Sequence, residues 1–228
     1  MMTPQKFVTA LSSIELEGVF NPYRDRCDQH DLADGPAVRR RNLRSYLEAI
    51  RELGTDTLWM GRDLGYRGGR RTGLAFTDEN NLSVLAASYP GARPSKATRG
   101  PVVAERTATE IWMLLQQLEL PPMLWNVFPF HPHEVGEPLS NRRYKAKELN
   151  AVHEINRTLI DWLGISRIIC VGRDAQKYAS TLGVDVEVVR HPSYGGVVEF
   201  RQGIRKLYRL DEGDGQALKQ AELFAQAL

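Results

Sequence analysis

Cysteine is scarce in this chain, and its scarcity excludes several kinds of site. The 228 residues include two cysteines, Cys27 and Cys170, and neither belongs to a Cys-x-x-Cys pair. Two thiols cannot hold a four-cysteine iron–sulfur cluster, and they leave a structural zinc ion without its usual ligands. We therefore expect both cysteines to stay reduced, and we expect the protein to use no metal and no cofactor.

Long hydrophobic runs are also missing. No apolar stretch approaches the roughly 20 residues that span a membrane, and the opening MMTPQKFVTALSS lacks the basic-then-apolar pattern of a signal peptide. Hydrophobic residues make up 42% and charged residues 25% of the chain, which argues against disorder. We expect a single domain over residues 1–228 that works in the cytosol and has no membrane partner.

Charge of one sign is not in large excess. The formal net charge is +2, so the total charge does not by itself indicate a nucleic-acid partner. Positive charge is clustered, however, and each cluster taken alone is typical of a solvated face. The clusters are Arg39 to Arg41, then Arg67 with Arg70 and Arg71, and then Arg142 and Arg143 with Lys145 and Lys147.

Helical and strand patterns alternate along the chain. Apolar residues recur at three- and four-residue steps in the expected helices, whereas short apolar runs mark the strands. The expected helices cover residues 38–53, 111–118, 146–163, 174–182, 197–207 and 216–228, and the expected strands cover 58–60, 123–128, 167–171 and 184–189. This order predicts the α/β class, with a three-layer α/β/α sandwich around a central, mainly parallel four-stranded sheet.

Three of the expected strands end in residues that can do chemistry. Gly61-Arg62-Asp63 follows the first strand, Asn126 lies in the second ahead of Phe128-Pro129-Phe130-His131-Pro132-His133, and His191-Pro192-Ser193 follows the last. Sites in parallel sheets form at the carboxyl ends of the strands. Glycines at 61, 65, 68 and 69 let the backbone approach a ligand closely. Because GxxxxGK[ST] and Gly-x-Ser-x-Gly are both absent, a phosphate loop and a nucleophile elbow are disfavoured.

Five short segments, in this order, resemble the motifs of the uracil-DNA glycosylase superfamily. They are Gly61-Arg62-Asp63-Leu64-Gly65-Tyr66, Gly73-Leu74-Ala75-Phe76-Thr77, Leu124-Trp125-Asn126-Val127, Gly172-Arg173-Asp174-Ala175-Gln176-Lys177 and His191-Pro192-Ser193. The resemblance covers residues 58–193 and places Asp63 at the position of the classical family's catalytic aspartate. Because two cysteines cannot hold a four-cysteine cluster, the resemblance is not to the iron–sulfur branch. It implies a monomeric, monofunctional enzyme that hydrolyses the N-glycosidic bond of uracil in DNA and leaves an abasic site. Such an enzyme is expected in the cytoplasm, associated with the nucleoid through its DNA substrate.

The resemblance also implies a role for each residue. Asp63 orients water and stabilises the cationic sugar, while a neutral His191 donates to the leaving base. Phe76 stacks on the base and Asn126 reads its edge, because an amide offers one acceptor and two donors. Gly61, Arg62 and Tyr66 complete the base pocket. Arg173, Lys177 and Ser193, together with Arg190, are expected to contact DNA phosphates. Tyr194 is expected to wedge into the vacated stack, at a position where superfamily members commonly have an aliphatic or basic residue.

Several positions depart from the superfamily pattern. Gly65 stands where the family has a tyrosine that excludes thymine, Leu64 replaces a proline, and Tyr66 would fill the gap only if the loop were shifted by one residue. Residues 19–27 are expected to form a loop of their own near the site. His131 and His133 have metal-like spacing without further ligands, so they are interpreted as structural or DNA-facing.

Three functions remain open from the sequence. The first is a uracil-excising glycosylase, and the second is a glycosylase of the same fold that removes other deaminated or oxidised bases, as Gly65 suggests. The third is a non-catalytic or covalently trapping binder of uracil-containing nucleic acid, against which Asp63 argues.

Overall fold

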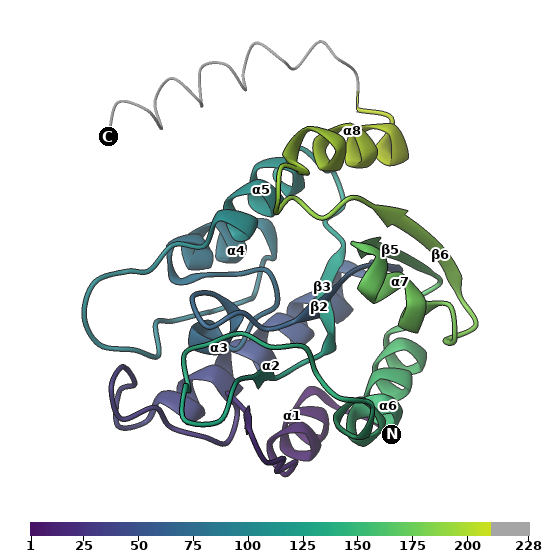
Figure 1. Ribbon diagram of the computed structural model, residues 1–228. Coiled ribbons are helices and arrows are strands. Elements are labelled where there is room, and N and C mark those ends of the chain that lie inside the picture. Colours follow the sequence, from purple (N-terminus) through teal and green to yellow (C-terminus); the bar gives the residue numbers. More distant parts are fainter. Residues whose placement is uncertain (211–228) are drawn as a thin grey trace.

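The computed structural model describes residues 1–210, so the helix expected over residues 216–228 lies outside the described part (Figure 1). The central sheet has four parallel strands in the order β3-β2-β5-β6. These strands are β2 (Thr57–Asp63), β3 (Met123–Phe128), β5 (Arg167–Val171) and β6 (Asp185–Val189). The larger helices are α2 (Gly35–Leu53), α5 (Arg106–Leu115), α6 (Ala146–Leu163), α7 (Arg173–Ala179) and α8 (Val197–Tyr208).

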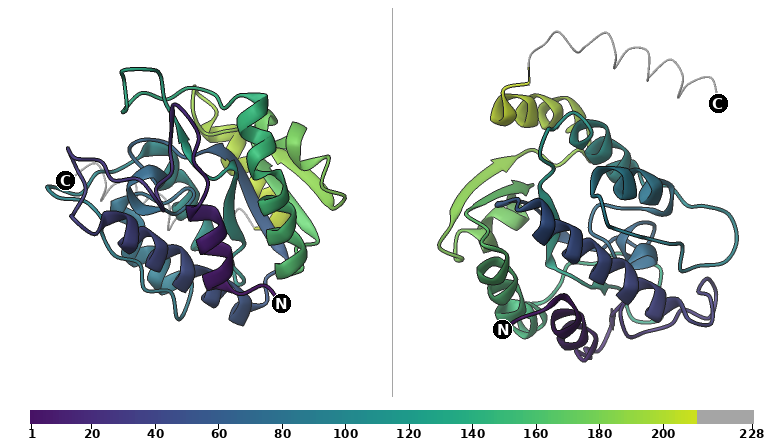
Figure 2. Two further views of the ribbon diagram at one scale, coloured as in Figure 1. Left: turned by 90° about the horizontal axis from the view of Figure 1, so that it is seen from below. Right: turned by 180° about the vertical axis from the view of Figure 1, so that it is seen from behind.

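Helices cover both faces of this sheet (Figures 1 and 2). Trp125 of β3 packs against Phe7 of α1 (Pro4–Ser12) and donates a hydrogen bond to Asn156 of α6. Trp59 of β2 lies beside Leu124 in the register and packs against Phe200 of α8. Because neighbouring residues of a strand point to opposite faces, α1 and α6 lie on one side of the sheet and α8 lies on the other. The predicted three-layer α/β/α fold is confirmed.

One strand runs further than the sequence suggested. A strand was expected to end at Met60, ahead of a glycine-rich loop, but β2 continues through Asp63. Gly61 and Asp63 pair with Asn126 and Phe128 of β3, so the parallel ladder carries the strand through the glycine. This extension fixes the backbone on which Asp63 is mounted.

Helix ends differ from the expected ones by a few residues. The helix expected over 111–118 is α5, which begins at Arg106 and ends at Leu115. Its start was missed because its first turn is largely polar and shows no apolar period. The helix expected over 174–182 ends at Ala179. Several short elements were not predicted: α1, β1 (Val19–Phe20), α3 (Gly69–Thr72), η1 (Glu79–Asn81), α4 (Leu82–Ser88) and β4 (His131–Pro132), which pairs with β1 in antiparallel fashion.

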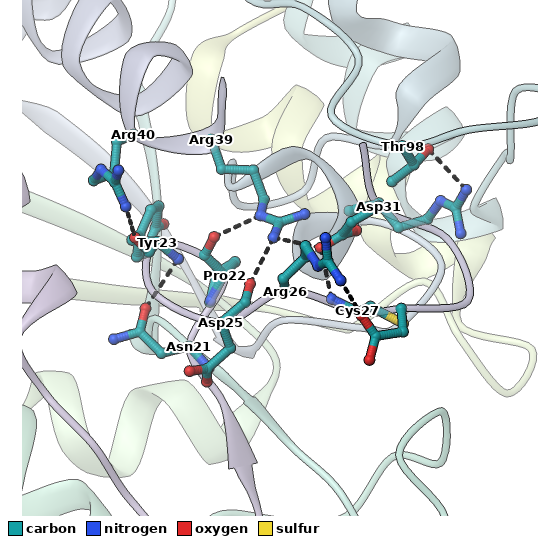
Figure 3. Close-up of polar contacts among 12 residues, drawn as sticks. Asn21, Pro22, Tyr23, Asp25, Arg26, Cys27, Asp31, Arg39, Arg40 and Thr98 are labelled. Atoms are coloured by element: carbon teal, nitrogen blue, oxygen red, sulfur yellow. Dashed lines mark hydrogen bonds and ion pairs between the residues drawn. The ribbon is translucent and has the colours of Figure 1, made fainter. Parts of the chain in front are cut away.

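The reading of the first two arginine clusters as solvated faces is wrong for three residues. Arg39, Arg70 and Arg71 are buried, while Arg41 and Arg67 are exposed. Arg39 donates to the carbonyls of Pro22 and Asp25 and forms a 2.7 Å ion pair with Asp31 (Figure 3). For Arg39, carbonyls and a carboxylate of the N-terminal loop accept from two of its guanidinium nitrogens, and they offset the cost of burying its charge.

This N-terminal loop, residues 19–31, is therefore held against the body of the domain. Arg40 donates to the carbonyl of Tyr23, and the Tyr23 hydroxyl donates to the carbonyl of Gly73 at 2.9 Å. Arg70 lies over the ring of Phe20 at 3.9 Å from its centroid. The loop thus supports the segment that leads from Gly73 to Phe76.

No helix among residues 1–210 is long and apolar enough to span a bilayer.

Candidate active site

A cleft of about 1040 Å³ opens at the carboxyl ends of the parallel strands. All three strand-end clusters contribute to its lining, together with residues from the loops before α5 and α6. The predicted site residues that line it are Arg62, Asp63, Phe76, Asn126, Arg173, Arg190, His191, Ser193 and Tyr194. The structure therefore brings most of the candidate residues into one cavity.

Asp63 lies at the end of β2 with its carboxylate held by a charged neighbour. Arg62 donates to both carboxylate oxygens, at 2.7 Å and 3.3 Å, and also pairs with Asp174 at 3.5 Å. Burial raises the pKa of Asp63, and the adjacent guanidinium of Arg62 opposes that rise. Because Arg143 also pairs with Asp174 at 3.2 Å, two arginines and two carboxylates form one network at the cleft wall.

Phe76 and Asn126 converge over Gly61. A β-carbon placed on Gly61 would collide with the Asn126 side-chain oxygen and would lie 2.5 Å from Cζ of Phe76. Asn126 is buried, yet its side-chain amide makes no hydrogen bond to any residue in the described range 1–210. A buried asparagine that ties strands together would be bonded to them, so this amide is available to a ligand in the cleft.

The backbone of Phe76 is strained and is fixed by a partner that the sequence did not reveal. Its φ of 53° is left-handed, which is uncommon for a bulky residue and clusters at functional sites. Trp112 of α5 donates from its indole nitrogen to the Phe76 carbonyl at 3.1 Å. Since the tryptophan looked like an ordinary core residue in the helix pattern, no sequence signal distinguished this role.

His191 is held in one tautomer by the residue two positions on. The backbone amide of Ser193 donates to Nδ1 at 3.1 Å, and the Ser193 hydroxyl lies 2.8 Å from the same nitrogen. Because Nδ1 accepts, the ring proton resides on Nε2. Burial, with Arg62 and Arg190 nearby, lowers the pKa of His191 to about 4, so the ring is neutral at pH 7.

The remaining predicted residues are less uniform. Tyr194 is 96% exposed at the mouth of the cleft with a left-handed backbone, and Gly195 follows with a φ of 78°. Arg173 lies at the start of α7 on the cleft, whereas Lys177 is exposed one turn further along, outside the lining. Tyr66 is half-buried and donates its amide to Asn141, and neither it nor Gly61 lines the cleft.

Glu105 was not a candidate from the sequence, yet it lines the same cleft. A β-carbon on Gly65 would lie 2.7 Å from Oε1 of Glu105, and one on Gly68 would collide with Oε2. Two of the four glycines expected to approach a ligand therefore make room for this carboxyl. Because Gly65 and Gly68 lie some 40 residues before Glu105 along the chain, only the fold reveals that they are in contact.

His131 is structural in this fold. Arg70 donates to its Nδ1 at 3.0 Å, its Nε2 bonds the Ser140 carbonyl at 2.8 Å, and burial lowers its pKa to about 3. Within the described residues, no group of three or more His, Cys, Asp or Glu side chains is arranged to hold a metal ion.

Comparison with known proteins agrees with the architecture. The arrangement of helices around the four-stranded parallel sheet matches a uracil-DNA glycosylase-like fold. Among solved structures, wild-type SMUG2 from Pedobacter heparinus superposes with a TM-score of 0.63, covering 96% of this chain and 100% of the other at 17% identity. No protein-family model and no curated protein matches the sequence.

Proposed function

We propose that this protein is a monofunctional DNA glycosylase that hydrolyses the N-glycosidic bond of uracil in DNA and leaves an abasic site. The observation that carries the proposal is the placement of Asp63, Asn126, Phe76 and His191 in one cleft, with His191 neutral and its Nε2 proton available. The likeness in fold to SMUG2, a member of the uracil-DNA glycosylase superfamily, supports the same class of reaction. We expect a monomer acting on DNA in the cytosol.

The proposed chemistry follows from how charge moves as the glycosidic bond breaks. The electron pair of the C1′–N1 bond leaves with the base, so positive charge develops on the sugar and negative charge on the base. In the proposed reaction the Asp63 carboxylate orients the attacking water, accepts its proton and stabilises the cationic sugar. His191 donates its Nε2 proton as a hydrogen bond to the anionic base, which then takes up a proton from solvent.

We assign recognition of the base to Phe76 and Asn126, the two buried side chains beside Gly61. The ring of Phe76 offers a stacking surface worth about 1–3 kcal/mol, and the open amide of Asn126 can pair with a donor and an acceptor on the base edge. A base in a duplex reaches such a cleft only after it is flipped out of the stack. Ser193 and the exposed Tyr194, beside Gly195, are assigned to hold the bent strand and to fill the gap.

A second candidate, a broader base range, is favoured by glycine at position 65. Gly65 lines the cleft and brings no aromatic side chain to crowd a 5-methyl group, and the group that lies beside it is the carboxyl of Glu105. Tyr66 does not line it. We therefore include deaminated and oxidised bases other than uracil among the substrates to be tested.

The test is single-turnover excision from otherwise identical oligonucleotides that carry uracil, thymine, hypoxanthine, xanthine or 5-hydroxymethyluracil. We expect release of uracil by the wild-type protein, with rates at least 100-fold lower for Asp63→Asn and for His191→Ala. His191→Ala loses a transition-state donor, which costs roughly 3–4 kcal/mol, and Asp63→Asn loses the fixed negative charge that stabilises the cationic sugar. Lys6→Ala, an exposed change on α1, serves as the control and should match the wild type.

The outcome that overturns the proposal is equally specific. Tight binding of uracil-containing DNA without release of any base would identify a binder rather than an enzyme. Release that survives both Asp63→Asn and His191→Ala would place the chemistry elsewhere.

A further inference from the structure

Glu105 occupies the side of the cleft that glycines leave open. Its carboxyl oxygens fill the positions that side chains on Gly65 and Gly68 would take, and it shares the cavity with Phe76 and Asn126. Its backbone is fixed as well, because its amide donates to Asp78 at 2.5 Å and its carbonyl accepts from Thr109 at 3.1 Å. The side chain is therefore held at the cleft wall by the fold.

Within residues 1–210, no side chain donates a hydrogen bond to this carboxyl or forms an ion pair with it. The charged groups that act on it are Asp78 before η1, Asp63 at the end of β2, and the exposed Arg67 in the loop after β2. Burial, followed by the charge of Asp78, raises the pKa of Glu105 to about 7, with Arg67 opposing the rise. A half-buried carboxyl without a protein partner faces the space where a ligand would sit.

We propose that Glu105 is a specificity residue of the base pocket, whose protonated carboxyl donates a hydrogen bond to an acceptor on the base edge that faces Gly65. This inference rests on the proposed glycosylase function, and it adds a second side chain, besides the amide of Asn126, that hydrogen-bonds the base. The bases that Glu105 would recognise are those with a carbonyl or ring acceptor on that edge.

The two protonation states of Glu105 have opposite effects on the reaction. A protonated carboxyl donates, and its hydrogen bond strengthens as the leaving base becomes negative. An ionised carboxylate only accepts, and it repels both the base carbonyl and the developing anion. Excision should therefore fall as pH rises through about 7, while the raised pKa of Asp63 governs the acid side.

The experiment measures the second-order rate constant for uracil excision between pH 5.5 and 9, since its pH profile reports groups of the free enzyme. Glu105→Gln keeps a donor that does not titrate, so its rate should stay flat on the alkaline side where the wild type declines. Glu105→Ala removes the donor, and we expect it to be about tenfold slower at pH 6. Glu119→Gln, on an exposed loop after α5, is the charge-matched control and should follow the wild-type profile.

A readout that needs no activity accompanies this profile. A raised carboxyl pKa means that the folded state keeps a proton which the unfolded state releases, so stability falls as pH rises from about 4.5 toward 7. Glu105→Gln should therefore raise the melting temperature more at pH 8.5 than at pH 5.

The failures are distinguishable. If Glu105→Gln and the wild type share one alkaline limb, or if Glu105→Ala is as fast as the wild type at pH 6, the inference about Glu105 is wrong while the glycosylase assignment stands. If the wild type releases no base at any pH, the proposed function fails together with this inference. In that case, a melting temperature that Glu105→Gln raises more at pH 8.5 than at pH 5 would still show that Glu105 titrates in the folded protein.

Discussion

Asp63 depends on Arg62 for its charge. Burial alone would favour the neutral acid, which cannot orient water as a base, and the bidentate contact from Arg62 opposes this. A neighbouring arginine lowers a carboxyl pKa by about 1–3 units. Arg62→Gln should therefore move the acid limb of the excision profile upward by about one pH unit, because the Asp63 pKa rises and less carboxylate is present at a given pH.

The measurement is the pH profile of uracil excision between pH 4 and 8, compared with that of Arg44→Gln. Arg44 lies on the exposed face of α2 and, among residues 1–210, pairs only with Glu48 and Gln5, so Arg44→Gln should leave the acid limb in place. An acid limb of Arg62→Gln that coincides with the wild-type limb would show that Arg62 does not set the charge of Asp63.

The tautomer of His191 depends on Ser193, which determines the ring nitrogen that carries the proton. The Ser193 amide, which can only donate, marks Nδ1 as the acceptor at 3.1 Å, so the Ser193 hydroxyl 2.8 Å away donates to the same nitrogen. Ser193→Ala removes one of these two donors and leaves the backbone amide. We expect the rate of excision to fall about three- to tenfold, with the ¹⁵N shifts of His191 showing a larger share of the Nδ1-protonated ring. A lower rate with an unchanged tautomer would instead assign the hydroxyl to DNA contact alone.

The N-terminal loop and α2 meet through one buried arginine. Arg39 reaches from α2 into residues 22–31, where it bonds two carbonyls and the Asp31 carboxylate. Removing one partner of a buried ion pair costs about 3–5 kcal/mol, because the other charge remains buried. Arg39→Met should lower the free energy of unfolding by about 3 kcal/mol, measured by urea denaturation.

Arg41→Met is the matched control, since Arg41 lies two residues on in the same helix and forms an exposed 3.2 Å pair with Asp34. Exposed pairs contribute about 0–1 kcal/mol. Equal losses for the two variants would contradict the idea that Arg39 clamps the loop. The test also bears on the site, because Tyr23 of that loop bonds the Gly73 carbonyl ahead of Phe76.

Strongly patterned elements could be predicted from the sequence, and the reason is visible in α6. Its apolar residues keep a helical period over Ala146–Leu163, and Gly164 ends it with a left-handed backbone, so pattern and cap agree. β3 and β5 are buried apolar runs and were predicted with their correct bounds. In contrast, β1 and β4 are two-residue strands that exist only because they pair with each other.

The candidate site was predictable only where a motif lies in one stretch of sequence. Asp63, Asn126 and His191 each follow or end a strand, so parallel topology brings them together. Glu105 and Trp112 belong to the site through contacts with Gly65 and Phe76, which are distant in sequence. The burial of Arg39 was missed for the same reason, since its partners lie in a loop with no periodic pattern.

Over the whole molecule, charge is nearly balanced, so any binding to DNA must come from cations near the cleft. The formal net charge is +2, and the candidate phosphate contacts Arg173, Lys177 and Arg190 lie on α7 and just after β6. Each phosphate neutralised contributes a slope of about −0.9 to a plot of log binding constant against log salt. We therefore expect a slope of about −3, much shallower than that of a strongly basic DNA-binding protein.

Lys177→Ala should reduce that slope by about one, whereas Arg51→Ala should not change it. Arg51 lies in the last turn of α2, which leads to the amino end of β2, so it is at the opposite end of the sheet from the cleft. Both slopes can be measured by fluorescence anisotropy, as the binding constant for an abasic-site duplex between 50 and 300 mM salt. A slope that ignores Lys177, or one as steep as −8, would mean that the DNA lies over a different and larger basic surface.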